Sequence, residues 1–274
     1  MKPEAWERLL IGATERVRAR IAALVLKGDG GKPVGVGASG DKTLRADRAA
    51  EDVLMRTLLG VKGARVLSEE AGSRGDPDAK TLAVVDPLDG SSNFARGIPF
   101  YCTSVAIVEG ASFDDITVGV VRDLVNGDVY HAVKGKGTKR NGVPVTASRV
   151  TEIPHAVLGI DISRGGGGLV ERLAPLIASA TRQVHFGANA LELCYVADKT
   201  TDAFIDLRGS IRITDIAAGY LIAKEAGAEV TDASGKELRA TFDLEHRLSL
   251  VASANRGLHK EILRLCRPAG ARRA

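Results

Sequence analysis

The chain has few of the residues that crosslink small secreted domains or hold structural zinc. Its 274 residues include three cysteines, Cys102, Cys194 and Cys266, which are widely spaced and form no Cys-x-x-Cys pair. A disulfide framework or a zinc site needs paired or closely spaced cysteines. We therefore expect neither, and we expect the three thiols to be small buried hydrophobic groups.

Aromatic residues and an excess of one charge are also lacking. Aromatics make up 4% of the chain, too few for a platform on which nucleic-acid bases stack. The formal charge is +4, and 38 basic residues are interspersed with 34 acids, with a local excess only near the C-terminal end, at Arg264, Arg267, Arg272 and Arg273. Basic surfaces attract nucleic acid when the charge is concentrated on one face. No nucleic-acid partner is therefore expected.

Long apolar runs are absent as well. No stretch reaches 18 uninterrupted apolar residues, the length at which a membrane span is suspected. Residues 1–7 contain two glutamates, where a signal peptide would have basic and then apolar residues. We therefore expect a cytoplasmic protein without a membrane partner.

Apolar residues amount to 45% of the chain, enough for a large core. Beyond a polar stretch at 147–152, strand and helix patterns alternate, which indicates an α/β half with some parallel pairing. We expect two halves, residues 1–150 and 151–274, packed as one compact unit. Periodicity predicts helices at 3–26, 44–59, 169–180 and 188–196, and strands at 65–68, 82–85, 101–108, 116–123, 128–133, 156–161, 183–186 and 203–206.

Residues 35–40 match G-x-G-x-x-G by letter. A dinucleotide-binding fingerprint follows a hydrophobic strand and opens a helix inside a βαβ unit. Here the match follows a helix and a run of glycine, lysine and proline at 27–33. We therefore interpret residues 27–43 as a mobile loop.

The most informative stretch is residues 81–94, T-L-A-V-V-D-P-L-D-G-S-S-N-F. Its apolar run predicts a buried strand that leads directly into Asp86 and Asp89. Pro87 fixes its own φ and holds Asp86 extended, so the backbone is expected to turn sharply at the two carboxylates. The small residues that follow offer backbone N–H groups to an anion. A single Asp-x-x-Asp is also common in ordinary turns, so the spacing alone leaves both interpretations open.

Three further acids are open to two interpretations. Glu69 follows a short predicted strand, and the ends of neighbouring strands would bring it close to Asp86. Asp47 and Asp215 each lie in the first turn of a predicted helix, where a carboxylate is also favoured by the helix dipole or as a cap. Each acid is therefore either a site residue or a helix-start residue.

Residues 86–94, D-P-L-D-G-S-S-N-F, resemble the signature of the inositol monophosphatase and fructose-1,6-bisphosphatase superfamily, the lithium-sensitive sugar phosphatases. Residues 215–228 are similar to its second signature, although Thr214 stands where an aromatic is common. The matching positions span 35–228 in the family's order. The resemblance implies a layered α-β-α-β-α sandwich of α/β and α+β parts, the sugar-phosphatase fold, with the active site between the halves.

Carried over position by position, the resemblance implies a Mg²⁺ site of two or three ions, with Mn²⁺ as an alternative; oxygen ligands suit such hard cations. The implied catalytic residues are Asp47 and Ser91, which orient the attacking water, and Glu69, a ligand of the activating ion. Ser91 stands where relatives more often have threonine, which keeps the hydroxyl. The implied metal ligands are Glu69, Asp86, the carbonyl of Leu88, Asp89, Asp215 and the hydroxyl of Ser91. The implied phosphate-binding amides are those of Gly90, Ser91 and Ser92.

The residues that would select the substrate are less well defined. Arg208 occupies the region where dedicated inositol monophosphatases place a glutamate, and an arginine suits a second phosphate better than a hydroxyl. We expect Arg208, together with Arg164 or Arg212, to receive a remote phosphate. The alternative is that Arg208 pairs with a surface acid.

With the loop at 35–43, these features resemble archaeal-type enzymes that hydrolyse both fructose 1,6-bisphosphate and inositol 1-phosphate. The resemblance implies a phosphoric monoester hydrolase of carbohydrate metabolism and gluconeogenesis, a small sugar or polyol phosphate as its partner, and a homodimer. Two alternatives stay open. One is a nucleotide phosphatase of the same fold that acts on 3′-phosphoadenosine compounds or NADP. The other is an inactive relative with a binding or regulatory role.

Overall fold

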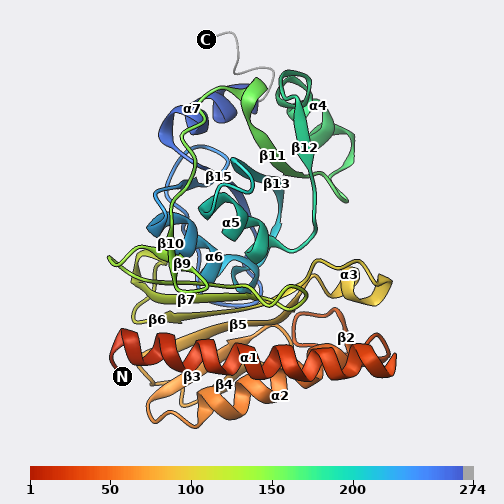
Figure 1. Cartoon of the computed structure of the whole chain (residues 1–274), viewed down its shortest axis with the longest axis vertical. Coiled ribbons are helices and arrows are strands. Elements are labelled where there is room, and N and C mark those ends of the chain that lie inside the picture. Colours follow the sequence, from red (N-terminus) through yellow and green to blue (C-terminus); the bar gives the residue numbers. More distant parts are fainter. Residues whose placement is uncertain (268–274) are drawn as a thin grey trace.

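The computed structural model describes residues 1–267; residues 268–274, which include Arg272 and Arg273, lie outside the described part. Helices and sheets alternate in five layers, as Figure 1 shows from the N-terminal helices upward. This is the α-β-α-β-α sandwich that the resemblance implies, and the expected fold class is confirmed. The three helical layers are α1 (Pro3–Lys27) with α2 (Arg45–Leu59), α5 (Asn189–Ala197) with α6 (Ile213–Glu225), and α4 (Gly166–Ser179) with α7 (Arg256–Leu265).

The first sheet has eight strands in the order β10-β9-β8-β7-β6-β5-β3-β4. Every neighbouring pair in it is antiparallel except β3 and β5, which run parallel with Ser68 opposite Val85. The residues that follow these two positions therefore lie side by side. The strands are β3 (Ala64–Ser68), β4 (Gly72–Gly75), β5 (Thr81–Asp89), β6 (Cys102–Val108), β7 (Ile116–Asp123), β8 (Val129–Val133), β9 (Thr138–Arg140) and β10 (Val143–Val145).

The second sheet has five strands in the order β12-β11-β13-β15-β14. β11 runs parallel to both β12 and β13, and the other two pairs are antiparallel, so the expected parallel pairing in this half is confirmed. The chain passes from the first sheet to the second between β10 and β11, near the expected boundary. The strands are β11 (Val157–Asp161), β12 (Arg182–Val184), β13 (Ala203–Ile211), β14 (Glu229–Thr231) and β15 (Leu248–Ser253).

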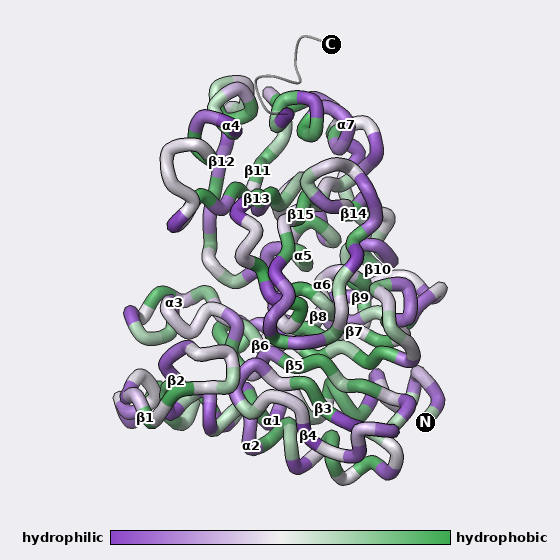
Figure 2. Tube along the Cα trace, turned by 180° about the vertical axis from the view of Figure 1, so that it is seen from behind, coloured by the Kyte–Doolittle hydropathy of each residue, from purple (hydrophilic) through white to green (hydrophobic). Residues whose placement is uncertain are grey.

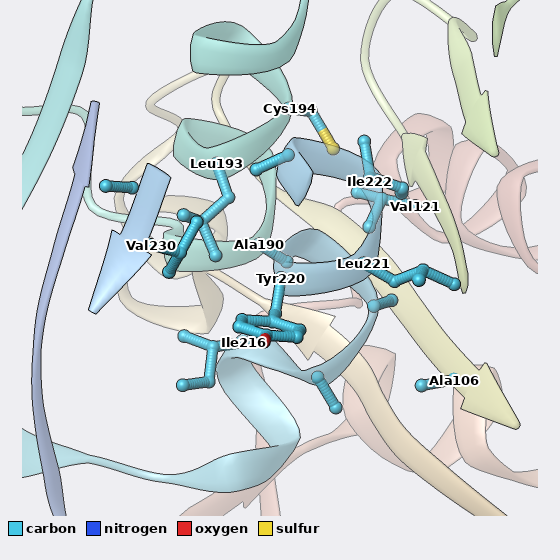
Figure 3. Packing of buried hydrophobic residues seen from close by; sticks show 14 of the residues in the cluster. Ala106, Val121, Ala190, Leu193, Cys194, Ile216, Tyr220, Leu221, Ile222 and Val230 are labelled. Carbon is cyan, nitrogen blue, oxygen red and sulfur yellow. The ribbon is translucent and has the colours of Figure 1, made fainter. Parts of the chain in front are cut away.

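The middle helical layer joins the two sheets into one core. Figure 3 shows Leu193 and Cys194 of α5 and Ile222 of α6 packed near Val121 of the first sheet and Val230 of the second. Apolar burial of this kind is the main favourable term in folding. Strands β5 to β7 appear largely hydrophobic in Figure 2. The three cysteines are buried, as expected.

The close packing of α6 on β7 in this core depends on a glycine. A Cβ added to Gly119 of β7 would lie 2.8 Å from the carbonyl oxygen of Ala218 in α6. No real Cβ contact is that short, so α6 could not rest on β7 at this depth with any other residue there. Because Asp215 lies in the first turn of α6, this contact also sets the height of the helix start above β5.

Four local expectations were wrong. Part of the expected loop 27–43 forms an antiparallel hairpin of β1 (Pro33–Val36) and β2 (Lys42–Leu44). The helix expected at 169–180 already begins at Gly166, because α4 packs its apolar face and tolerates glycines in its first turn. The connection between the strands expected at 65–68 and 82–85 contains a further strand, β4, and β5 continues through Pro87 instead of turning.

Several elements were not predicted from the sequence. These are the three-residue strands β9, β10 and β14, the longer strand β15, the helix α7, and the 3-10 turns η1 (Phe113–Asp115) and η2 (Ile153–His155). The strands of three residues carry too little alternation to be recognised, and pairing with a neighbour decides them. Among residues 1–267, no helix has both the length and the apolar character to cross a membrane.

Candidate metal centre and active site

Three acids from distant parts of the chain meet between the two halves. Glu69 directly follows β3, Asp86 lies in β5, and Asp215 lies in the first turn of α6. One carboxylate oxygen from each lies within 4.8 Å of those from the other two. The parallel β3–β5 pair places Glu69 beside Asp86, which confirms that neighbouring strand ends bring the two acids together.

The course of β5 explains how Asp86 and Asp89 reach the same site. Residues three apart on a regular strand point to opposite faces of the sheet. Asp86 is opposite Ser104 of β6 and Asp89 is opposite Cys102, and the register shifts between these two pairs. Such an irregularity re-aims side chains, and it falls at Pro87, which has no N–H for the ladder. The N–H of Leu88 instead donates to Asp86 Oδ1 at 3.0 Å.

Asp89 connects this site to the second half of the chain. Its Oδ2 accepts a hydrogen bond of 2.7 Å from the N–H of Ala190 at the start of α5, and the thiol of Cys102 lies 3.6 Å from the same oxygen. The following residue, Gly90, has φ of 88°, and an added Cβ would lie 2.9 Å from the carbonyl oxygen of Phe100. Only glycine fits there, so α3 (Ser91–Arg96) begins directly beside Asp89.

The acids are mutually repulsive and largely buried. Burial, followed by the charges of Glu69 and Asp89, raises the pKa of Asp86 well above its usual value. Burial and then Asp215 raise the pKa of Glu69, although Arg212 acts in the opposite direction. Burial also raises the pKa of Asp89 and Asp215. A divalent cation would relieve both the repulsion and the desolvation, and carboxylate oxygens are its preferred ligands, so these residues fit a hard metal ion.

Asp47 has two roles open to it in the structure. It is the third residue of α2, and its Oδ2 accepts a hydrogen bond of 2.6 Å from the N–H of Leu44, so it caps the helix. Burial raises its pKa to about 7, and Glu70 and Glu51 add to the shift. A carboxyl that titrates near neutrality is suited to proton transfer. Asp215 is likewise both a helix-start residue, with a 3.2 Å bond from the N–H of Arg212, and a member of the acidic site.

The other residues expected to bind phosphate lie as follows. Ser91 and Ser92 open α3, and Ser91 is half-buried. Arg164 is exposed in the connection between β11 and α4, where its φ is 58°. The roles of Leu88, Ser91 and the amides of residues 90–92 stay predictions, as does the pairing of Ser91 with Asp47.

Arg208 is held by acids. Its guanidinium lies 2.5 Å from Asp206 Oδ2 and 2.6 Å from Asp161 Oδ2, and it donates to Ser163 Oγ at 2.8 Å. The structure therefore shows the alternative that Arg208 pairs with acids, except that these acids, Asp206 and Asp161, are buried instead of lying on the surface.

Arg212 lies elsewhere, 2.8 Å from Glu69 Oε1 and 2.5 Å from Asp41 Oδ2.

The sequence reading missed the acidic cluster around Arg208. Asp161 and Asp206 end up directly opposite each other on the parallel strands β11 and β13. Glu192 of α5 is buried nearby and accepts a 2.9 Å bond from the N–H of Gly187. Burial raises the pKa of Glu192 to about 7. The sequence did contain a signal for this cluster. The predicted strands 156–161 and 203–206 each end in an acid, just as the predicted strands 65–68 and 82–85 lead into Glu69 and Asp86.

Comparison with known proteins agrees with this geometry. A model of the inositol monophosphatase family matches residues 7–270. A fructose-1,6-bisphosphatase/inositol-1-monophosphatase from Methanothermobacter thermautotrophicus is 36% identical, with 94% of this chain and 95% of the relative covered. A solved structure from Pyrococcus horikoshii, described as a hypothetical protein with similarities for inositol-1 monophosphatase, has a TM-score of 0.84 at 31% identity and covers 97% of this chain and 100% of its own.

A third relative differs in its chemistry. The bifunctional NADP phosphatase/NAD kinase of Methanococcus maripaludis is 35% identical, and the match covers 84% of this chain but 44% of the relative. The present chain therefore corresponds to less than half of that protein. The family model and the full-length relatives together show that the chain belongs to the inositol monophosphatase family.

Proposed function

We propose that the protein is a metal-dependent phosphatase that hydrolyses a phosphate monoester of a sugar or polyol, with fructose 1,6-bisphosphate and inositol 1-phosphate as candidate substrates. The observation that carries the proposal is the convergence of Glu69, Asp86 and Asp215 within 4.8 Å beside the start of α3. The name of the Methanothermobacter relative, a fructose-1,6-bisphosphatase/inositol-1-monophosphatase, supports both substrates.

The acids would hold Mg²⁺, or Mn²⁺ in its place, at two or three positions. Bound cations supply Lewis-acid polarisation of the phosphoryl group and acidify water at neutral pH. The chain's own contribution is to fix the ligands. Asp89 is oriented by the N–H of Ala190, and Asp215 by the N–H of Arg212, so neither carboxylate has to reorganise when a cation or substrate enters.

In the proposed reaction the water oxygen attacks phosphorus and the bond from phosphorus to the sugar oxygen breaks. Asp47 Oδ2 keeps its bond to Leu44, which fixes the carboxylate, while Oδ1 accepts a proton from the attacking water. Ser91 Oγ orients that water from the other side. The amides of residues 90–92 hold the phosphoryl oxygens as negative charge moves to the departing alkoxide, which is then protonated by solvent.

A phosphate-release panel tests the proposal. The purified protein is assayed with fructose 1,6-bisphosphate, inositol 1-phosphate, 3′-phosphoadenosine 5′-phosphate and NADP, each with Mg²⁺, with Mn²⁺ and with a chelator. We expect metal-dependent release from the first two substrates and none with the chelator. Release that persists at full rate in the chelator would contradict the metal-dependent mechanism. Absence of release from every compound would favour the inactive-relative alternative.

NADP is the second candidate substrate because one relative is a bifunctional NADP phosphatase/NAD kinase. If NADP has the highest kcat/KM in the panel, the nucleotide alternative replaces the sugar-phosphate proposal. A gluconeogenic role, a cytoplasmic location and a homodimer complete the proposal. Light scattering on the eluting peak of a gel-filtration column tests the dimer, and a mass of one chain would contradict it.

A further inference from the structure

The expected phosphate-binding amides lie between two side chains that bond to one segment of the second half of the chain. This segment, residues 186–190, leads from β12 into the first turn of α5. On one side of the amides, the N–H of Ala190 donates to Asp89 Oδ2 at 2.7 Å. On the other side, Asn93 Nδ2 donates to the carbonyl of Phe186 at 2.7 Å. The 186–190 segment therefore holds both ends of the stretch that is expected to bind phosphate.

The 186–190 segment also packs directly on this stretch. A Cβ added to Gly90 would lie 3.2 Å from the Cβ of Ala188. One added to Gly187 would lie 3.3 Å from Asn93 Nδ2. Gly187 has φ of 85°, a conformation that glycine adopts without strain. Because close packing transmits small displacements, a change in the shape of the segment shifts Gly90 and Asn93.

Glu192, on α5, fixes the shape of the 186–190 segment. Its Oε1 accepts a 2.9 Å hydrogen bond from the N–H of Gly187, and its own N–H donates to the carbonyl of Ala188 at 3.0 Å. Gly159 of β11 leaves room for the other side of the carboxylate, because a Cβ there would lie 3.1 Å from Glu192 Oε2. The side chain is 2% exposed, so water does not compete for the bond to Gly187.

We propose that Glu192 is a positioning residue, which fixes the 186–190 segment and thereby aligns the metal ligand Asp89 and the phosphate-binding amides beside it. The inference rests on the proposed function, and it assigns a role to a buried acid outside the metal centre. When the N–H of Gly187 loses its acceptor, the segment has to move to find another one, since an unpaired N–H inside the protein is costly. That movement carries Ala190 away from Asp89.

Two substitutions of Glu192 separate the hydrogen bond from the rest of the side chain. Glu192→Ala removes the acceptor, whereas Glu192→Gln keeps an oxygen of the same reach and should restore the wild-type behaviour. Glu225→Ala is the matched control. Glu225, on α6, likewise accepts hydrogen bonds from two glycine N–H groups, those of Gly135 and Gly137, at 2.8 and 2.9 Å. It lies at the opposite end of α6 from Asp215.

The first measurement is amide hydrogen exchange of the metal-free protein. We expect Gly187 and Ala190 to exchange about 10-fold faster in Glu192→Ala, and close to the wild-type rate in Glu192→Gln and in Glu225→Ala. Faster exchange at Gly187 with an unchanged rate at Ala190 would overturn the proposal, because the segment would then not carry the change to Asp89. An equal acceleration in Glu192→Gln would also overturn it.

The second measurement is Mn²⁺ binding by titration calorimetry, which needs no catalysis. Groups that orient a metal ligand typically change metal affinity by about 10-fold or more. We therefore expect Kd for Mn²⁺ to rise about 10-fold in Glu192→Ala and to stay within about 2-fold in Glu192→Gln and in Glu225→Ala. Thermal unfolding of the two alanine variants shows whether they lose similar stability.

The outcomes separate this role from the proposed function. An unchanged Kd in Glu192→Ala, with Mn²⁺ still bound, would overturn the positioning role and leave the metal centre intact. An equal rise in Glu225→Ala would assign the effect to general destabilisation and overturn the positioning role as well. A wild-type protein that binds no Mn²⁺ would overturn the metal centre and the inference together.

Discussion

Two groups of acids lie at the ends of parallel strand pairs in this protein, one in each sheet. In the first sheet, β3 and β5 bring Glu69 beside Asp86, and Asp215 completes the group. In the second sheet, β11 and β13 place Asp161 directly opposite Asp206. The same topological feature, two parallel strands that each lead into an acid, therefore builds both groups.

The two groups differ in how their charge is balanced. Arg208 contacts both Asp161 and Asp206, and it follows Asp206 by two residues on the same strand, β13. Arg212 reaches the first group from its edge and pairs there with Glu69, while sharing its charge with Asp41. Asp86 is buried among like charges that raise its pKa. Arg208 neutralises the charge of Asp161 and Asp206, so that pair of acids is structural. Asp86 has no arginine partner among the described contacts, so its charge is left for a bound cation to neutralise.

The largest expected effect comes from Asp86→Asn. We expect kcat to fall roughly 10³-fold or more, because several kcal/mol of charge stabilisation depend on this ligand. Thermal stability of the metal-free protein should be unchanged or higher, because the substitution removes one of several buried like charges. Phosphate-release kinetics and thermal unfolding measure the two effects. Retention of more than about a tenth of kcat would exclude Asp86 as a bridge between two ions.

Arg208→Ala should have the opposite signature. Asp161 and Asp206 would be left buried without their cation, which we expect to lower the free energy of unfolding by about 3 kcal/mol. Urea unfolding measures this loss, with Asp86→Asn as the comparison.

The same variant tests the remote-phosphate proposal for Arg208. A charge-assisted contact to a second phosphate contributes about 1.5–3 kcal/mol, so kcat/KM for fructose 1,6-bisphosphate should fall roughly 10- to 100-fold more than for inositol 1-phosphate. Equal losses for the two substrates would leave Arg208 with its structural role alone.

Asp47→Asn separates proton transfer from metal binding. We expect kcat to fall about 10²-fold, since general-base assistance is worth this much, while Kd for Mn²⁺ stays close to the wild-type value. Asparagine can still accept the hydrogen bond from Leu44, so the start of α2 should be preserved. A comparable loss of Mn²⁺ affinity would instead place Asp47 among the metal ligands.

The smallest expected effect is on the pH dependence of stability. Asp47 and the acids of the first group have pKa values raised above those of the unfolded chain, so the native state holds more protons than the unfolded state above pH 4. The metal-free protein should therefore lose stability as the pH rises from about 4 through 7, where Asp47 titrates. Urea unfolding across this range measures the slope. Saturating Mg²⁺ should reduce it, and an identical slope with and without Mg²⁺ would contradict the proposed site.

The candidate metal ligands were implied by the resemblance of residues 86–94 and 215–228 to the two family signatures. The local pattern by itself predicts a buried strand that ends in acids and an acid in the first turn of a helix at Asp215, but it leaves open whether these acids bind metal or belong to ordinary turns and helix starts. Amphipathic periodicity likewise predicted α1 and α2. The hairpin at 33–44 escaped prediction because β1 is exposed along its length and shows no apolar alternation.

By itself, then, the sequence determined the long amphipathic helices, the buried strands and the acids that follow them, since these depend on a few neighbouring residues. Only the tertiary structure decided which acids meet which cations. The register of β11 with β13 commits Arg208 to two aspartates, and the height of α6 on Gly119 brings Arg212 to Glu69 and Asp41. These contacts join residues far apart in the chain, and their partners are set by how whole layers pack, which local patterns do not encode.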